Sequence, residues 1–125
     1  MHYKYYLKDI TSGETHQLFQ DSVIGRGSQC DIKIAHNTVS RRHATIVFIR
    51  KNSRNICRIT DGWRGTPSSY GVRVNDKKVQ ACDLEPGDII QLGKVKLELL
   101  VVQNDISCVY EVEKSTMGID NSDSS

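Results

Sequence analysis

Three short polar stretches carry the side chains of this chain that could do chemistry. Residues 23–28, VIGRGS, place Arg26 between two glycines at the end of an apolar run. Residues 40–44, SRRHA, combine a hydroxyl with two guanidinium groups, and residues 61–75 hold two adjacent serines before a tyrosine and a glycine. Guanidinium groups and hydroxyls together are suited to hold a phosphate. The three stretches therefore predict an anion site, if the fold brings them together.

Enzymatic chemistry fits these stretches less well. A dinucleotide-binding fingerprint needs a third glycine where Cys30 stands, and no helical pattern follows. Ser40 and His43 suggest a hydrolase. However, the sequence around them forms no Gly-x-Ser-x-Gly elbow, and no oxyanion loop is visible. We expect no catalysis, and we expect His43, at the start of an apolar strand, to be a buried strut that forms hydrogen bonds.

Composition narrows the class further. The 125 residues suit one domain, and 38% hydrophobic with 26% charged residues fits a folded chain. No apolar run approaches the ~20 residues of a membrane span, and the start shows no signal peptide. The four cysteines form no Cys-x-x-Cys pair and the four histidines do not cluster with them, so we expect no metal or cofactor. Because no secretory signal is visible, we expect a cytoplasmic protein whose cysteine thiols are reduced.

The net charge is modest and uneven. It is +2 overall, with +5 in residues 1–110 and −3 in residues 111–125. Nucleic-acid binders usually show a stronger basic bias. The cluster Arg50, Lys51, Arg54 and Arg58 is the alternative nucleic-acid surface. No aromatic residue interleaves it, which favours a solvated hairpin end over a single-strand binding site.

The elements that must position the polar stretches are predicted to be β-strands. Residues 3–8 and 95–101 alternate with period two, and residues 56–60 and 71–74 predict further short strands. Residues 43–49 are apolar on both parities, which predicts a strand buried on both faces. Pro86 and Gly87 predict a type II turn. Many short strands with regular turns and no long 3.6-residue period favour an antiparallel sandwich or barrel.

Taken in order, four segments of the chain resemble the forkhead-associated (FHA) domain family. They are residues 25–26, 40–44, 69–75 and 84–93, and the resemblance covers about residues 3–112. It implies an 11-stranded antiparallel β-sandwich over residues 1–112, whose loops at one end bind phosphothreonine peptides in signalling. Residues 113–125 are then an acidic, serine-rich tail or linker, expected to be disordered.

The resemblance also implies roles for single residues. Arg26 would grip the phosphate, Ser40 would donate its hydroxyl, and Ser69 would close the pocket, while Arg41 would add contacts. The pocket scaffold would be Gly25, His43, Gly71 and Asn75, with Asn75 bracing the loop from beneath.

Tyr70 departs from the family pattern, which has Asn there to bond the peptide backbone. Loss of two such bonds would cost about 1–3 kcal/mol. The alternative function is therefore an FHA fold with a weakened pocket, used for phosphorylation-independent interaction or oligomerisation.

The tail suggests one further ligand. Thr116 stands three residues before Ile119, and the resemblance implies that this third residue is read. If the last strand ends near Val112, Thr116 cannot reach the loops of its own molecule. We therefore expect a monomer that associates only after Thr116 is phosphorylated.

Overall fold

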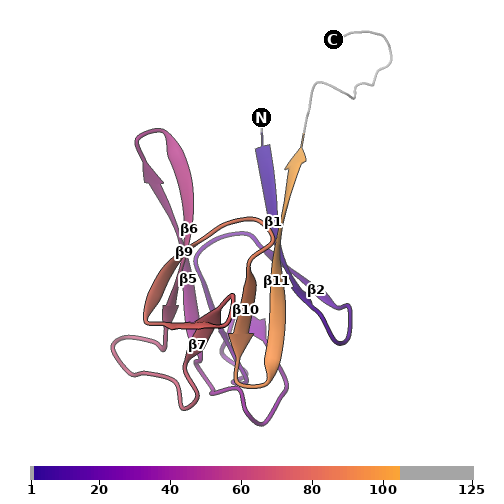
Figure 1. Ribbon diagram of the computed structural model, residues 1–125, viewed down its shortest axis with the longest axis vertical. Helices are drawn as coiled ribbons and strands as arrows, with labels where there is room; N and C mark the ends of the chain where they lie inside the picture. Colours follow the sequence, from indigo (N-terminus) through magenta and orange to yellow (C-terminus); the bar gives the residue numbers. More distant parts are fainter. Residues whose placement is uncertain (1, 105–125) are drawn as a thin grey trace, which may run out of the picture.

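The computed structural model describes residues 2–104, and these residues form eleven strands and no helix (Figure 1). The predicted domain end at Val112, the tail over residues 113–125, Thr116 and Cys108 lie outside the described residues. The strands are β1 (His2–Asp9), β2 (Thr15–Leu18), β3 (Ser22–Gly25), β4 (Ile32–Lys33), β5 (Ala44–Lys51), β6 (Arg54–Asp61), β7 (Val72–Val74), β8 (Lys77–Val79), β9 (Ala81–Leu84), β10 (Ile89–Leu92) and β11 (Val95–Asn104).

The strands form two sheets. One has the order β2-β1-β11-β10-β7-β8 and the other β4-β3-β5-β6-β9. The predicted 11-stranded sandwich is thus confirmed, but it is not wholly antiparallel, because β3 and β4 pair in parallel. A hairpin cannot join parallel strands. Residues 26–31 therefore cross over between β3 and β4, and this short crossover contains Arg26, Gly27 and Ser28 of the first polar stretch.

The core lies between the two sheets. Leu7 of β1 pairs with Leu99 of β11, and both side chains are buried, as the alternating patterns predict. Between the layers, the Tyr5 and Phe48 rings meet edge to face at 5.0 Å. The prediction that residues 43–49 are buried on both faces is wrong. Val47 and Ile49 are only half-buried, because the fold has two layers and none covers the outer face of β5.

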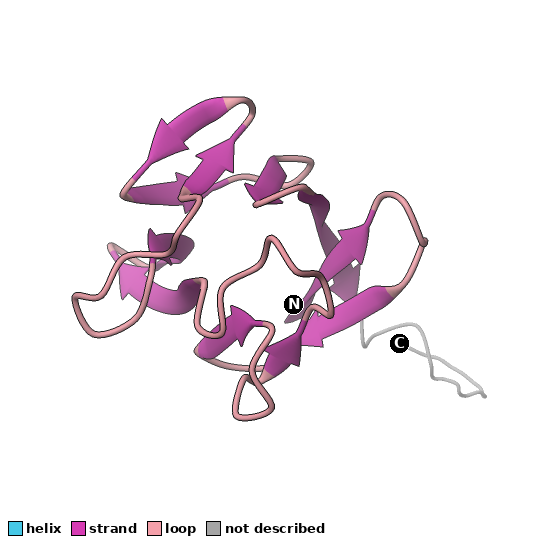
Figure 2. Ribbon diagram, turned by 90° about the horizontal axis from the view of Figure 1, so that it is seen from below, coloured by secondary structure: helices cyan, strands magenta, loops and turns pink. Residues whose placement is uncertain are grey.

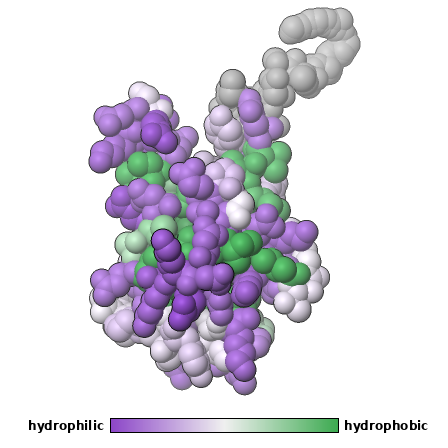
Figure 3. Space-filling model, in the orientation of Figure 1, coloured by the Kyte–Doolittle hydropathy of each residue, from purple (hydrophilic) through white to green (hydrophobic). Residues whose placement is uncertain are grey.

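The two ends of the sandwich differ. Both ends of the described chain lie at the top of Figure 1, and the loops that connect β3 to β5 and β6 to β7 lie at the bottom. Figure 2 looks onto the lower end, where loops rather than strands meet the viewer. At the upper end the tip of the β5–β6 hairpin is hydrophilic (Figure 3). It holds Arg50, Lys51 and Arg54, far from the lower loops.

The predicted turn between β9 and β10 is present. Gly87 has φ of +90°, and the Asp88 amide donates to the Glu85 carbonyl at 3.0 Å. This geometry fits the type II turn that Pro86 and Gly87 predict. No helix in residues 2–104 is long and apolar enough to cross a membrane.

Candidate functional site

Arg26 stands at the end of β3, held against the second polar stretch. Its amide donates to the Ser40 carbonyl at 2.9 Å, and its Nε donates to the Val39 carbonyl at 3.0 Å. A Cβ on Gly25 would lie 2.2 Å from the Arg41 carbonyl oxygen, so only glycine permits this approach. Among residues 2–104 the two terminal guanidinium nitrogens of Arg26 have no partner, and they remain available to a ligand.

Ser40 joins the second polar stretch to the third. Its Oγ accepts a hydrogen bond from the Ser69 amide at 3.0 Å. The Ser40 hydroxyl hydrogen therefore stays free to point outward as a donor. Arg41, the next residue, is exposed, and its side chain forms no hydrogen bond or ion pair within the described part of the chain. The structure thus brings Arg26, Ser40, Arg41 and Ser69 to one end of the sandwich.

His43 is fully buried beneath these loops. Its Nδ1 accepts from the Ser40 amide at 3.0 Å, which leaves Nε2 to donate to the Gly71 carbonyl at 2.7 Å. Burial lowers the pKa of His43, and the bond to Gly71 and the charge of Asp61 oppose this without reversing it. Because backbone groups occupy both ring nitrogens, a neutral His43 is a strut between two loops and cannot serve Ser40 as a base.

Hydrogen bonds of Ser68 and Asp61 hold the third polar stretch in its loop conformation. The Ser68 hydroxyl donates to Asp61 Oδ1 and accepts from the Gly71 amide at 2.9 Å. Gly71 has φ of +81°, a conformation that favours glycine. This loop leaves Ser69 and Tyr70 exposed, and Tyr70 shows 64% of its surface to solvent.

Lys78 belongs to the site, although the sequence analysis missed it. A Cβ on Gly71 would lie 3.0 Å from Lys78 Cε, and Lys78 lines a hollow of about 430 Å³ together with Ser69 and Gly71. Lys78 adds a cation beside the loop. Lys78 is the middle residue of β8, and its pairing opposite Arg73 of β7 brings it back toward Gly71.

Asn75 does not have the predicted position. Its Nδ2 donates to Asp88 Oδ1 and its Oδ1 accepts from the Ile89 amide, both at 3.0 Å. The side chain therefore ties the β7–β8 turn to the start of β10, and these bonds do not reach the Ser69 loop. The expectation that Asn75 braces that loop from beneath is corrected: it fixes the far end of β7, and its effect on the site is indirect.

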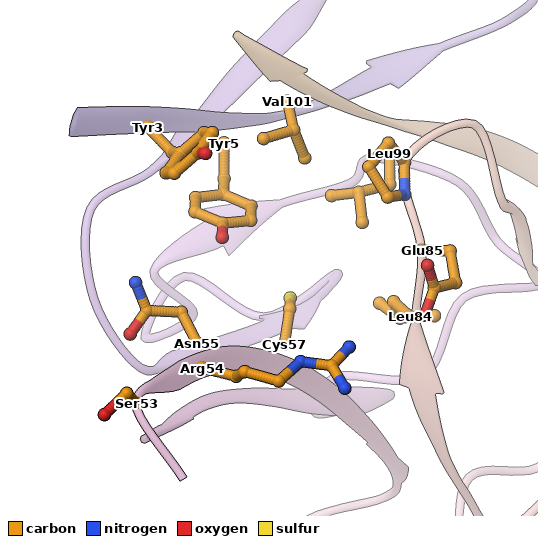
Figure 4. Close-up of a pocket in the computed structure, with 11 residues that line it drawn as sticks. Tyr3, Tyr5, Ser53, Arg54, Asn55, Cys57, Leu84, Glu85, Leu99 and Val101 are labelled. Atoms are coloured by element: carbon orange, nitrogen blue, oxygen red, sulfur yellow. The ribbon is translucent and has the colours of Figure 1, made fainter. Parts of the chain in front are cut away.

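A second hollow, of about 370 Å³, opens between the sheets at the opposite end (Figure 4). Tyr3 and Tyr5 face Cys57 across it, with Arg54 and Asn55 at the hairpin side. Burial raises the pKa of Cys57 to about 11, so this thiol stays protonated at neutral pH and is a poor nucleophile. None of the predicted site residues lines this hollow.

Metal ligands are not gathered in the described part of the chain. No group of three or more His, Cys, Asp or Glu side chains within residues 2–104 could hold a metal ion. Cys30, Cys57 and Cys82 are all unpaired. The chemistry on offer at the lower end is thus that of cations and hydroxyls, which together suit an anion with several acceptor oxygens.

The class of protein follows from the fold and from the family comparison. The FHA domain model matches residues 22–93, more than half of the chain and all three polar stretches. The chain belongs to the FHA domain family.

Individual relatives agree with this assignment. FhaA of Mycobacterium tuberculosis, an FHA domain-containing protein, is 35% identical over 86 residues, which cover 68% of this chain and only 15% of FhaA. A solved structure concerned with phosphothreonine-dependent FHA domain interactions is 31% identical with a TM-score of 0.66, and the match covers 78% of this chain and 95% of that one. EmbR of M. tuberculosis, solved in complex with a low-affinity phosphopeptide, is 32% identical with a TM-score of 0.66, covering 78% of this chain and 24% of EmbR.

Proposed function

We propose that this chain is a phosphothreonine-peptide-binding module that mediates phosphorylation-dependent protein–protein interaction in signalling, with no catalysis of its own. One observation carries the proposal. The backbone fixes Arg26 against Ser40, and the Ser40 hydroxyl, which accepts from Ser69, keeps its hydrogen for a ligand. A phosphate brings nearly two charges and three acceptor oxygens, which these donors match. The phosphothreonine-dependent and phosphopeptide-bound relatives support the same ligand class.

Replacement of Arg26 tests the proposal. A charge-assisted hydrogen bond contributes about 1.5–3 kcal/mol, so Arg26→Ala should weaken phosphopeptide binding by about tenfold to over a hundredfold. Calorimetric titration with a phosphothreonine peptide library, and with the same peptides unphosphorylated, measures this. Arg50→Ala removes an equal charge from the distant hairpin and should bind as the wild type does. Undiminished binding by Arg26→Ala would mean that the pocket lies elsewhere or that the ligand is not a phosphate.

Tyr70 favours a second candidate. It is exposed at the rim and has no carboxamide to bond a peptide backbone. A module with so weakened a pocket would bind its partner regardless of phosphorylation, or would oligomerise. Phosphatase treatment of a captured partner separates the two candidates, because only the first predicts release.

Three further properties belong to the proposal. We place the module in the cytoplasm, as a monomer while Thr116 is unphosphorylated, with protein rather than nucleic acid as its partner. The basic cluster on β5 and β6 lies at the end away from the loops, and one member, Arg58, is already paired with Asp83 at 2.7 Å. That pairing weakens the case for a nucleic-acid surface.

A further inference from the structure

A tryptophan flanked by two guanidinium groups lies next to the phosphate residues. Ser40, Ser69, Arg42 and Trp63 line one hollow of about 340 Å³. The Arg42 guanidinium carbon lies 4.2 Å from the centre of the Trp63 ring, and that of Arg64 lies 4.5 Å away. Both distances are within the range of cation–π contacts, which position a guanidinium while leaving its N–H edges free to bond. The hollow thus joins the proposed phosphate contacts at Ser40 and Ser69 to Arg42 and Trp63, and Trp63 also lines the adjoining hollow that holds Arg64.

The backbone at Arg64 is unusual for an arginine. Trp63 and Thr66 exchange two backbone hydrogen bonds, each 3.0 Å, and so close a two-residue turn. Arg64 has φ of +49° and Gly65 has φ of +81°, the pattern in which Asn-Gly is preferred at these two positions. A residue with a Cβ is strained in this left-handed region. The turn thus holds Arg64 in a conformation that is costly for a residue with a Cβ, while its guanidinium group contacts the Trp63 ring.

No acid neutralises these arginines within residues 2–104. The ion pairs there involve Glu14 and Asp83, neither with Arg42 or Arg64. The hydrogen bond of Arg42 goes to the neutral Gln29 side chain. Asp61 lines a hollow together with Arg64 and keeps its negative charge, but its Oδ1 is held by the Ser68 amide and hydroxyl, and it forms no ion pair with Arg64. Arg41 and Arg42 line the hollow beside Ser40, and Arg64 lines the adjoining hollow that shares Trp63. Together these arginines carry more positive charge than one phosphate, already met by Arg26, requires.

We propose that Arg42, Trp63 and Arg64 form a second anion subsite, which takes a phosphate or carboxylate from another residue of the same peptide. The inference rests on the proposed function and deepens it, because it names the ligand as a phosphothreonine peptide with a second anionic side chain. Exposed guanidinium groups bind both anions, and the bidentate fork of Arg suits either one. The two sources, phosphorylation and acidic sequence, share this chemistry.

Matched peptides test the subsite. One phosphothreonine peptide with alanine at all flanking positions is compared with versions that carry one Glu, or one phosphoserine, at each position from three before to three after the phosphothreonine. A second anion at the correct position should tighten calorimetric binding by about tenfold, the effect of one charge-assisted hydrogen bond. Gain from Glu identifies a carboxylate ligand, and gain from phosphoserine alone identifies a phosphate. Equal affinity for all versions would overturn the subsite and leave the proposed function standing.

Variants then assign the gain to residues. Arg64→Asn should remove most of the tenfold gain yet keep the turn, since asparagine before glycine is favoured there. Arg42→Gln should do the same, and Arg50→Gln, an equal charge change at the far hairpin, should keep the full gain. The alanine-flanked peptide should bind Arg64→Asn as it binds the wild type. An undiminished gain in both Arg42→Gln and Arg64→Asn, with unchanged melting temperatures, would overturn the proposal. If the wild type bound none of these phosphothreonine peptides, the proposed function itself would be refuted.

Discussion

At the scale of single residues, the proposed function makes Tyr70 the residue that would set how strongly the site holds a peptide. The donors for a phosphate are in place around Ser40, but position 70 presents a rigid ring where the FHA family has a carboxamide. A tyrosine hydroxyl cannot donate and accept in the geometry with which an amide meets a peptide backbone. Under the proposed function, phosphate recognition and peptide-backbone recognition would therefore be separable in this chain.

Tyr70→Asn should tighten phosphopeptide binding. Two restored backbone bonds predict a gain of about 5- to 150-fold in affinity. Calorimetry of both forms against one phosphothreonine peptide measures it, with Tyr70→Phe as the control that removes only the hydroxyl. Weaker binding by Tyr70→Asn would show that the tyrosine ring itself contacts the ligand.

Replacement of His43 should reduce the stability of the fold rather than remove a contact with the ligand. His43→Ala leaves the Ser40 amide and the Gly71 carbonyl without their buried partner, which should cost about 1–3 kcal/mol. Because burial lowers its pKa below the ordinary value of 6.5, the unfolded chain takes up a proton first. The stability from His43 is thus fully present above pH 6.5 and is lost as the pH falls toward the depressed value.

Urea unfolding at pH 7.5 and 5.5 measures both effects. The wild type should lose more stability between these pH values than His43→Ala does, since the variant lacks the group that titrates. An unchanged unfolding midpoint at pH 7.5 together with lost peptide binding would place His43 in contact with the ligand.

At the scale of elements, the long strands and the short strand β7 could be predicted, whereas β4 and β8 could not. Residues 3–8 and 95–101 are long enough for a period of two to appear, and they pair as β1 and β11. The two residues of β4 and the three of β8 are too short to carry any period. The parallel β3–β4 pair depends on a crossover that local pattern does not encode.

The site shows the same division. Arg26, Ser40 and Ser69 belong to short motifs whose resemblance to the FHA family indicates them as candidate site residues. Lys78 and the Trp63–Arg64 turn depend on how hairpins fold back, so contacts between distant residues decide their roles. The Asn75 side chain bonds Asp88 and Ile89 rather than the Ser69 loop, and no local sequence pattern indicates these partners.

Asn75 links two turns, and its replacement should loosen them without affecting the ligand. Asn75 has φ of +51°, and its side chain bonds both Asp88 and Ile89. Asn75→Ala should lower the free energy of unfolding by about 1–3 kcal/mol through lost bonds and backbone strain. Asn75→Gly removes the same side-chain hydrogen bonds without the backbone strain, so its loss of stability measures the bonds alone. Denaturant unfolding and peptide titration check this, and a large loss of affinity in a stable Asn75→Gly protein would contradict it.

At the scale of the whole molecule, β11 spans the distance between the two ends. β11 begins directly after Lys94. The Lys94 amide donates a hydrogen bond at 2.8 Å to Oγ1 of Thr38, which lies in the β4–β5 loop at the lower end. The strand is described as far as Asn104, at the opposite end of the sandwich (Figure 1). Ten residues of strand cover about 33 Å. A segment that leaves β11 at Asn104 therefore starts about one sandwich length away from Arg26.

That distance bears on Thr116. The expected strand end near Val112 and Thr116 itself lie outside the described part of the chain, so the expectation that Thr116 cannot reach the loops of its own molecule stays a prediction. On that expectation, a phosphorylated Thr116 binds the pocket of a second molecule.

Phosphorylation of Thr116 should therefore produce association that depends on concentration, whereas the unphosphorylated chain should remain monomeric. Each molecule would offer a pocket at one end and a ligand at the other, a head-to-tail contact that grows into chains unless it closes. Sedimentation velocity over a concentration series compares the phosphorylated wild type with phosphorylated Arg26→Ala, which keeps the tail but lacks the phosphate contact. Kinase-treated Thr116→Ala controls for modification elsewhere. Larger species should appear in the wild type alone, because only it has both halves of the contact; identical sedimentation of the wild type and Arg26→Ala would exclude Thr116 as a ligand of this pocket.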